Sequence, residues 1–171
     1  TLSDQPIDEI SRRLLAGQRI AWVRGRVEFG ACSLNNRIVL ALPSKASPPN
    51  DLPARLQRSE PFLPRRLAMT SDYAKAGLPI DSGSNLTDLL ARAQIRVTPR
   101  TPALRQISES PDGTICPQVI TTGSDPELHA LLCEIGSKTD LPIVQIDDFA
   151  LRGSPIVASE AAAVQALLRS R

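Results

Sequence analysis

Residues 115–171 constrain the fold most, because strand, loop and helix signals follow one another there in a consistent order. The run 119–122 is short and β-branched, which is typical of a strand, and Gly123 ends it. The next residues favour a helix start, with Ser124 predicted to cap the first turn and Pro126 to pre-set it. Apolar residues then recur at helical spacing and predict one buried helix face: Leu128, Leu131, Leu132 and Ile135.

The same stretch continues with two more apolar runs and a last helix. Gly136 is predicted to end the first helix in a left-handed conformation, which glycine adopts without strain. Residues 141–146 form a second strand, and because a helix joins it to the first, the two strands are expected to be parallel. A third, shorter run covers residues 155–158. Ser159 then precedes an apolar stretch, which predicts a capped final helix over 160–168.

The N-terminal part adds a helix and a strand pair. Acids lead and arginines follow in the periodic stretch 4–16, which predicts a helix. Strands are expected over 19–29 and 37–42, antiparallel to each other, because Asn35 tolerates the positive φ of a tight turn. Gly25 indicates a bulge or a close backbone approach. These signals predict a single-domain α/β fold, a mixed sheet of about five strands with flanking helices and a C-terminal β-α-β-β-α unit.

The centre of the chain carries weaker signals. Ten of the 15 prolines lie between residues 43 and 111. Segment 43–66 is predicted to be irregular, and its apolar content is too high for a free linker. It is expected to be either a long surface loop or an arm that lies on a partner. Asn85 is predicted to cap a short helix, and residues 95–97 are a candidate strand.

Charge is distributed unevenly along the chain. The net charge is +2, but residues 1–105 carry +7 and residues 106–171 carry −5, and 17 of the 20 basic residues are arginine. One interpretation, which we favour, is that the acidic part packs against the basic part. The other is that the arginines meet phosphates, the candidates being Arg12, Arg13, Arg24, Arg26, Arg65 and Arg66. Nucleic acid is disfavoured, because aromatic residues make up only 3% and no recognition motif is present.

Location and redox state follow from what the sequence lacks. No run of about 18 apolar residues occurs, so no membrane-spanning segment is expected. Residues 1–13 do not have the apolar segment of a signal peptide, and the three cysteines are too widely spaced for a disulfide framework. A cytoplasmic location is therefore expected.

The candidate ligand site is the loop Thr121-Thr122-Gly123-Ser124, which lies between a strand end and a helix start. Free backbone N–H groups and the helix dipole favour an anion at such a position. The loop lacks the repeated glycines of a dinucleotide site and the lysine of a P-loop. The competing interpretation, a capped helix with nothing bound, is favoured about three to one. Asp125 also opposes an anion, because its own carboxylate can fill the position.

Other chemistry-bearing groups are sparse, and neither a metal nor a cofactor is predicted. His129 and Cys133 share a helix face and would need Cys116 or Cys32 to complete a zinc site, but no metal-ligand motif is present. Asp147-Asp148 follow a strand end, where catalytic carboxylates are often found, but adjacent residues there point apart, and Asp148 is expected to cap a turn.

Two stretches, DPELHALLCEIGSKTDLPIVQID and GRVEFGACSLNNRIVLALP, together resemble swivelling β/α domains such as the small subunit of aconitase X hydro-lyases. The resemblance covers less than half of the chain, and the glycine- and serine-rich loop of that family has no counterpart here. It implies an enzyme subunit whose active site is shared with a partner chain.

The absence of a catalytic constellation favours a different function. The leading prediction is a non-enzymatic accessory or binding subunit of a larger cytoplasmic assembly, able to bind a small anionic ligand. The hydro-lyase-like subunit is the alternative. The expected partner is another protein subunit or a second copy, contacted through the basic N-terminal part and segment 43–66.

Overall fold

A computed structural model describes residues 6–26, 35–43, 66–79, 95–108, 112–150 and 154–169. Within these ranges the elements follow one another as α1 (Ile7–Leu15), β1 (Ile20–Val23), β2 (Arg37–Ala41), β3 (Arg66–Thr70), α2 (Ser71–Gly77), α4 (Pro102–Ile107), β4 (Cys116–Ile120), α5 (Pro126–Thr139), β5 (Ile143–Asp148) and α6 (Glu160–Arg169). None of these helices has the length and apolar character needed to cross a lipid bilayer.

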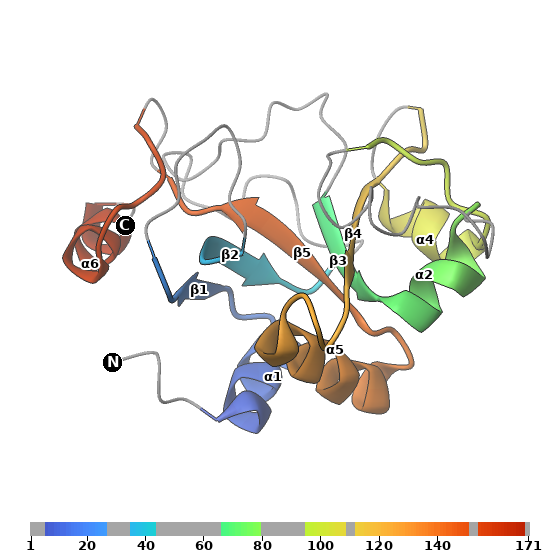
Figure 1. Ribbon diagram of the computed structural model, residues 1–171, viewed down its shortest axis with the longest axis horizontal. Coiled ribbons are helices and arrows are strands. Elements are labelled where there is room, and N and C mark those ends of the chain that lie inside the picture. The colour runs from blue at the N-terminus through green and yellow to red at the C-terminus, as the bar shows by residue number, and fades with distance from the viewer. Residues whose placement is uncertain are drawn as a thin grey trace.

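The five strands form one mixed sheet in the order β1-β2-β5-β3-β4. Only β3 and β4 are parallel, and every other neighbouring pair is antiparallel. The predicted fold class is therefore confirmed: a single-domain α/β fold with a five-stranded mixed sheet and flanking helices (Figure 1).

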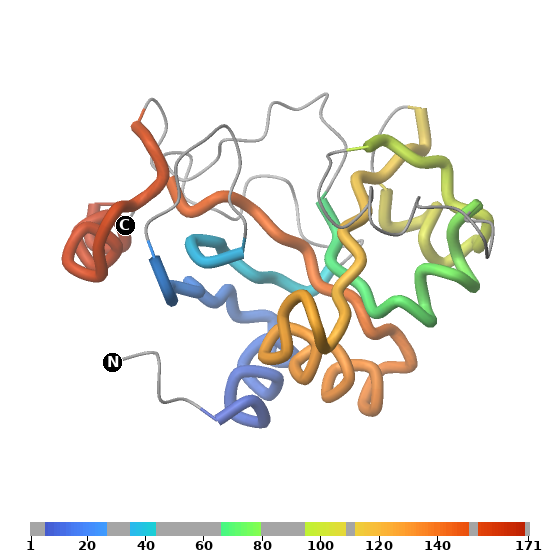
Figure 2. The backbone as a smooth tube through the Cα atoms, viewed as in Figure 1, coloured from blue at the N-terminus to red at the C-terminus, as the bar shows by residue number. Residues whose placement is uncertain are grey.

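Helices cover both faces of this sheet. Helices α1 and α5 pack on one face, over a cluster that includes Trp22, Leu40 and Ile146. On the other face, α2 and α4 cover β3 and β4, while α6 packs near Val39 and Phe149 at the opposite end. Figure 2 shows this separation, with α2 and α4 far from α6. The side chains of successive strand residues alternate between the faces, so each strand contributes to both layers.

The N-terminal predictions are largely confirmed. The periodic stretch at the start forms α1, and β1 and β2 pair antiparallel with Trp22 opposite Ile38. Asn35 has φ 81°, the left-handed backbone that the turn prediction required. Gly25, with φ 57°, follows β1, and a Cβ there would lie 3.2 Å from Oδ1 of Asn36, so a side chain approaches it where a bulge or a close backbone approach was predicted.

The predicted parallel pairing of the C-terminal strands is wrong. β3 lies between β4 and β5, parallel to the former and antiparallel to the latter, so β4 and β5 run in opposite directions. Helix α5 lies across one side of the sheet in Figure 1 instead of returning the chain to the start of a parallel strand. The order strand, helix, strand, bridge and helix is nevertheless present, because Ile156 forms an isolated bridge with Ala150 before α6.

The end of one helix also differs from the prediction. Gly136 lies inside α5, and Asp140, with φ 59°, is the left-handed residue that ends the helix. Glycine is required at 136 for a different reason, since a Cβ there would lie 2.8 Å from Cβ of Pro142. The last helix is confirmed: the N–H of Ala162 donates to Oγ of Ser159 at 3.1 Å.

The centre contains elements that the sequence did not reveal. β3 and α2 follow each other directly, and α4 begins at Pro102, a first-turn position that proline favours. Val97 forms a single bridge with Ile115, where a strand was a candidate. The irregular segment 43–66 lies outside the described residues except at its two ends, as does the whole helix predicted after Asn85.

Candidate functional site

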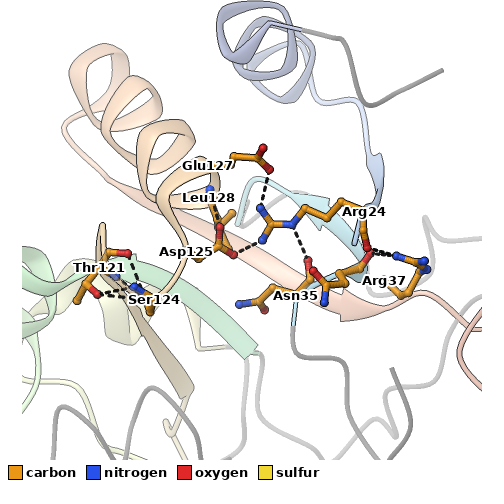
Figure 3. Close-up of polar contacts among 9 residues, drawn as sticks. Arg24, Asn35, Arg37, Thr121, Ser124, Asp125, Glu127 and Leu128 are labelled. Atoms are coloured by element: carbon orange, nitrogen blue, oxygen red, sulfur yellow. Dashed lines mark hydrogen bonds and ion pairs between the residues drawn. The ribbon is translucent and has the colours of Figure 1, made fainter. Parts of the chain in front are cut away.

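The end of β1 brings a charged side chain to the start of α5. Arg24 follows β1, and its guanidinium reaches the first turn of α5, more than 100 positions later in the sequence. It forms an ion pair with Asp125 and donates to Oε2 of Glu127 at 2.8 Å (Figure 3). The Arg24 guanidinium also lies over the face of the Trp22 ring, with its carbon 5.1 Å from the ring centre, and this cation–π contact helps to hold it in place. We call Arg24, Asp125 and Glu127 the arginine cluster.

Arg24 stays charged in this setting. Burial alone would lower its pKa, but hydrogen bonds to Asp125 and Glu127, and their negative charges, outweigh that effect and raise the pKa above its ordinary value. Its side chain is only 21% exposed, so the interaction with Asp125, itself 8% exposed, is little screened by solvent.

A second arginine holds the backbone that carries the cluster. Arg37 is buried at the start of β2 and donates to the carbonyl oxygens of Arg24, Asn36 and Gly25, the last two at 2.9 and 3.2 Å. The segment on either side of residue 24 is thus attached to β2 by a side chain as well as by the strand ladder. This arrangement orients Arg24 toward α5 (Figure 3).

The predicted loop 121–124 lies beside the arginine cluster, and its polar groups bond to one another. Oγ of Ser124 accepts from the N–H of Thr121 at 2.9 Å, and the N–H of Ser124 lies 3.1 Å from Oγ1 of Thr121. Thr122 and Gly123 are exposed at its tip. The predicted cap by Ser124 is wrong, since Asp125 is the N-cap and its Oδ1 accepts from the N–H of Leu128 at 3.1 Å. Asp125 thus serves both the helix and Arg24.

Asp147, one of the two carboxylates noted at a strand end in the sequence, is partly buried on the other face of the sheet. Oδ2 of Asp147, near the end of β5, accepts from Nε2 of Gln145 at 2.9 Å. Burial raises the pKa of Asp147, and the Gln145 hydrogen bond and the charges of Arg19 and Arg66 oppose this only in part. A carboxyl group whose pKa is raised by burial is a candidate for proton transfer.

Asp148 has a structural role. Its Oδ1 accepts from Nη1 of Arg66 at 2.7 Å, which joins the end of β5 to the start of β3. The turn that it was expected to cap lies partly outside the described residues. Together with the arginine cluster, this pair shows basic residues of the first half of the chain bound to acids of the second half, as the favoured interpretation of the charge distribution expected.

The histidine and two of the three cysteines lie in the described part of the chain. Sγ of Cys133 lies 3.7 Å from Nδ1 of His129 on the surface of α5. Cys116 lies on β4, and Cys32 is outside the described residues. Within the part of the chain that the structure describes, no group of three or more His, Cys, Asp and Glu side chains could hold a metal ion.

Comparison with known proteins gives a family. Residues 11–171 match the family described as carbamoyltransferase C-terminus. The chain is 26% identical over 152 residues to nodulation protein NolO of Bradyrhizobium diazoefficiens, and 24% identical over 178 residues to the uncharacterized protein sll1178 of Synechocystis. It is also 24% identical over 170 residues to the uncharacterized protein MJ1051 of Methanocaldococcus jannaschii.

These alignments cover 89%, 95% and 99% of this chain, but only 28%, 29% and 32% of the respective relatives. The chain thus spans about a third or less of the length of each relative. The family is a different one from the swivelling hydro-lyase domains that two stretches of the sequence resemble. Because the match extends over nearly the whole sequence, the chain belongs to the carbamoyltransferase C-terminus family.

Proposed function

We propose that this chain is a binding module for carbamoyl transfer, which holds an anionic group of a substrate while the rest of a larger carbamoyltransferase-type protein completes the reaction. The observation that carries the proposal is the family match over residues 11–171. The chain corresponds to about a third of its relatives, so we infer that other parts of such proteins contribute to the reaction.

The arginine cluster and the adjacent loop 121–124 are the proposed position of the anion. Carbamoyl donors of the acyl-phosphate class are anionic, and arginine binds phosphate oxygens in a bidentate manner. A helix N-terminus adds unpaired N–H groups and a favourable dipole. In the structure Asp125 fills this position, so an entering anion exchanges with the Asp125 carboxylate and takes over its contact with Arg24.

A substitution at Asp125 tests this exchange. We expect Asp125→Asn to tighten the binding of carbamoyl phosphate and inorganic phosphate by about tenfold. The substitution removes the negative charge that competes with the anion for the Arg24 guanidinium. Asparagine is also a good N-cap, so the helix start should be preserved. The measurement is a titration followed by the amide resonances of residues 121–128.

Two control variants separate the contributions. Arg24→Gln should abolish the gain when combined with Asp125→Asn, because it removes the cation. Glu127→Gln should have a smaller effect than Asp125→Asn, since the Glu127 side chain is 64% exposed and its interaction is screened. If the resonances stay unmoved in the Asp125→Asn chain at millimolar ligand, the loop 121–124 and the arginine cluster do not bind an anion.

A catalytic contribution is the second candidate, and Asp147 is the observation that favours it. With a raised pKa, its carboxyl group is suited to take a proton from an acceptor hydroxyl as the carbamoyl group is transferred. In a complete carbamoyltransferase containing this chain, Asp147→Asn should then lower kcat by about 100-fold and leave KM within a small factor. An unchanged kcat would mean that Asp147 takes no part in the proton transfer, and only the binding role would remain.

A further inference from the structure

The strand β1 forms one border of the sheet. In the strand order β1 pairs only with β2, and no other described strand lies along its second edge (Figure 1). The N–H of Arg24 donates to the carbonyl of Asn36 across this pair, so residue 24 directs its backbone groups toward β2. Because this direction alternates along an antiparallel strand, Trp22 and Ile20 also point toward β2. The N–H and C=O groups of Ala21 and Val23 therefore point away from the sheet.

An apolar pocket adjoins this edge, beside which no described strand lies. It has a volume of about 300 Å³ and is lined by residues 20–24, by Ile7 and Ile10 of α1, and by Glu127 at the start of α5. All five consecutive residues 20–24 contribute, although their side chains alternate between two faces of the sheet. The pocket therefore follows the edge of the strand. A cavity of about 150 Å³ holds benzene, so this one accommodates a leucine-sized side chain.

The charged side chains around the pocket already have partners. Nε of Arg13 lies 2.7 Å from Oε1 of Glu9, which also pairs with Arg12, and Arg24 is held by Asp125 and Glu127. A charged ligand group would compete with these pairs. An uncharged occupant keeps them, and the apolar lining favours an aliphatic one.

We propose that the β1 edge binds an extended aliphatic segment of a partner protein, which adds a strand beside β1 and places a side chain in the pocket. The backbone groups of Ala21 and Val23 specify an extended chain, since only another strand offers N–H and C=O groups at matching intervals. The pocket then selects an aliphatic residue over a charged one. The pocket shares Arg24 and Glu127 with the arginine cluster, but the backbone groups of Ala21 and Val23 take no part in that cluster. The inference therefore holds whether or not the loop 121–124 binds an anion.

The test uses an acetylated and amidated pentapeptide with the sequence threonine, valine, leucine, valine, threonine. Trp22 is the single tryptophan of the chain and lines the pocket, so its fluorescence reports binding there. We expect a saturable fluorescence change, together with slowed hydrogen exchange of the Ala21 and Val23 amides. A peptide with aspartate in place of leucine should not bind, because the pocket would bury its charge.

Variants of the peptide and of the protein test the backbone pairing. Two peptides are methylated on alternating amide nitrogens, and only the one whose methyl groups face β1 should lose binding. Val23→Pro removes an outward N–H without touching the β2 ladder and should weaken binding about tenfold. Val23→Thr keeps the N–H and the branched shape, and it should bind like the original chain.

Three outcomes would overturn the proposal. The first is no binding at millimolar peptide. The second is binding that neither methylated peptide changes, which would make the pocket a site for a small apolar molecule. The third is a dimer of the chain, seen by sedimentation and dissociated by Val23→Pro, which would make a second copy the occupant. None of these outcomes depends on carbamoyl transfer.

Discussion

At the scale of single residues, the sheet changes the acid chemistry of Asp147. The side chains of Asp147 and Asp148 point to opposite faces, and among the described residues Asp148 has a close ion-pair partner, Arg66, whereas Asp147 has none. Asp147 has a neutral hydrogen-bond donor, Gln145, which stabilises its charged form less than an adjacent cation would. Two neighbouring carboxylates of the same type thus differ in role, because Asp148 is held in an ion pair while burial dominates at Asp147.

The raised pKa of Asp147 has a defined effect on stability. Because the folded chain holds this proton more tightly, the group favours folding below its unfolded pKa of about 3.9, and this contribution is lost as pH rises through the raised folded pKa. Asp147→Asn has no carboxyl group that titrates at this position. Its free energy of unfolding should therefore rise relative to that of the original chain as the pH increases from acid to neutral. Denaturant unfolding at several pH values measures this.

A matched control is available on the surface. The side chain of Asp72 is 95% exposed, so Asp72→Asn removes a carboxylate without the burial that acts on Asp147. If the difference in unfolding free energy for Asp147→Asn depends on pH no more than that for Asp72→Asn, burial does not raise the pKa of Asp147.

At the scale of elements, α5 connects the parts of the molecule. Its apolar stripe is fully buried under the sheet, its N-cap binds Arg24, and its C-terminal half contacts the loop before β5. Lys138 also reaches α1, where Nζ lies 3.0 Å from Oγ of Ser11. The position of β5 therefore depends on how closely the end of α5 approaches Pro142.

Gly136 allows that approach. Alanine is favoured over glycine inside a helix by about 1 kcal/mol, but a Cβ at this position would lie 2.8 Å from Cβ and 3.3 Å from Cα of Pro142. The proline ring is rigid, so the helix end or the loop has to move. We expect Gly136→Ala to lower the free energy of unfolding by about 1–3 kcal/mol, measured by denaturant titration.

The neighbouring position supplies the control. Ser137 is exposed and bonds only within its own helix, through Oγ to the carbonyl of Glu134 at 2.8 Å. Ser137→Ala should therefore change the stability by less than about 0.5 kcal/mol. A Gly136→Ala chain that is as stable as the Ser137→Ala chain would show that the loop at Pro142 moves freely.

At the scale of the whole molecule, the protection of backbone amides against hydrogen exchange should decrease from the middle of the sheet outward. β2 and β5 have a strand on each side and helices on both faces, whereas α6 buries only Ala163 and Ala166 and leaves Val164 55% and Leu168 61% exposed. Few buried apolar contacts mean a low free energy of local opening. We expect the slowest amide exchange in β2 and β5, and faster exchange in α6 than in α5. Equal rates in the two helices would contradict this.

The sequence by itself determined the local elements that have strong periodic signals. Helices α1, α5 and α6 and strands β1, β2 and β5 follow from apolar spacing, caps and turn residues that act over a few positions. The turn at Asn35 is also a local feature, because asparagine tolerates positive φ better than most residue types. Arg24 was named as a candidate for binding phosphate, but no local pattern connects it with Asp125 or Glu127.

Tertiary structure decided the remaining features, because each joins residues that are distant in sequence. The insertion of β3 between β4 and β5 makes the C-terminal strands antiparallel, and a five-residue strand among prolines carries no periodic signal strong enough to predict it. Asp125, and not the predicted Ser124, caps α5, and the same Asp125 pairs with Arg24 from the distant end of β1. The raised pKa of Asp147 depends on burial by the folded chain, and burial exists only after the elements have packed.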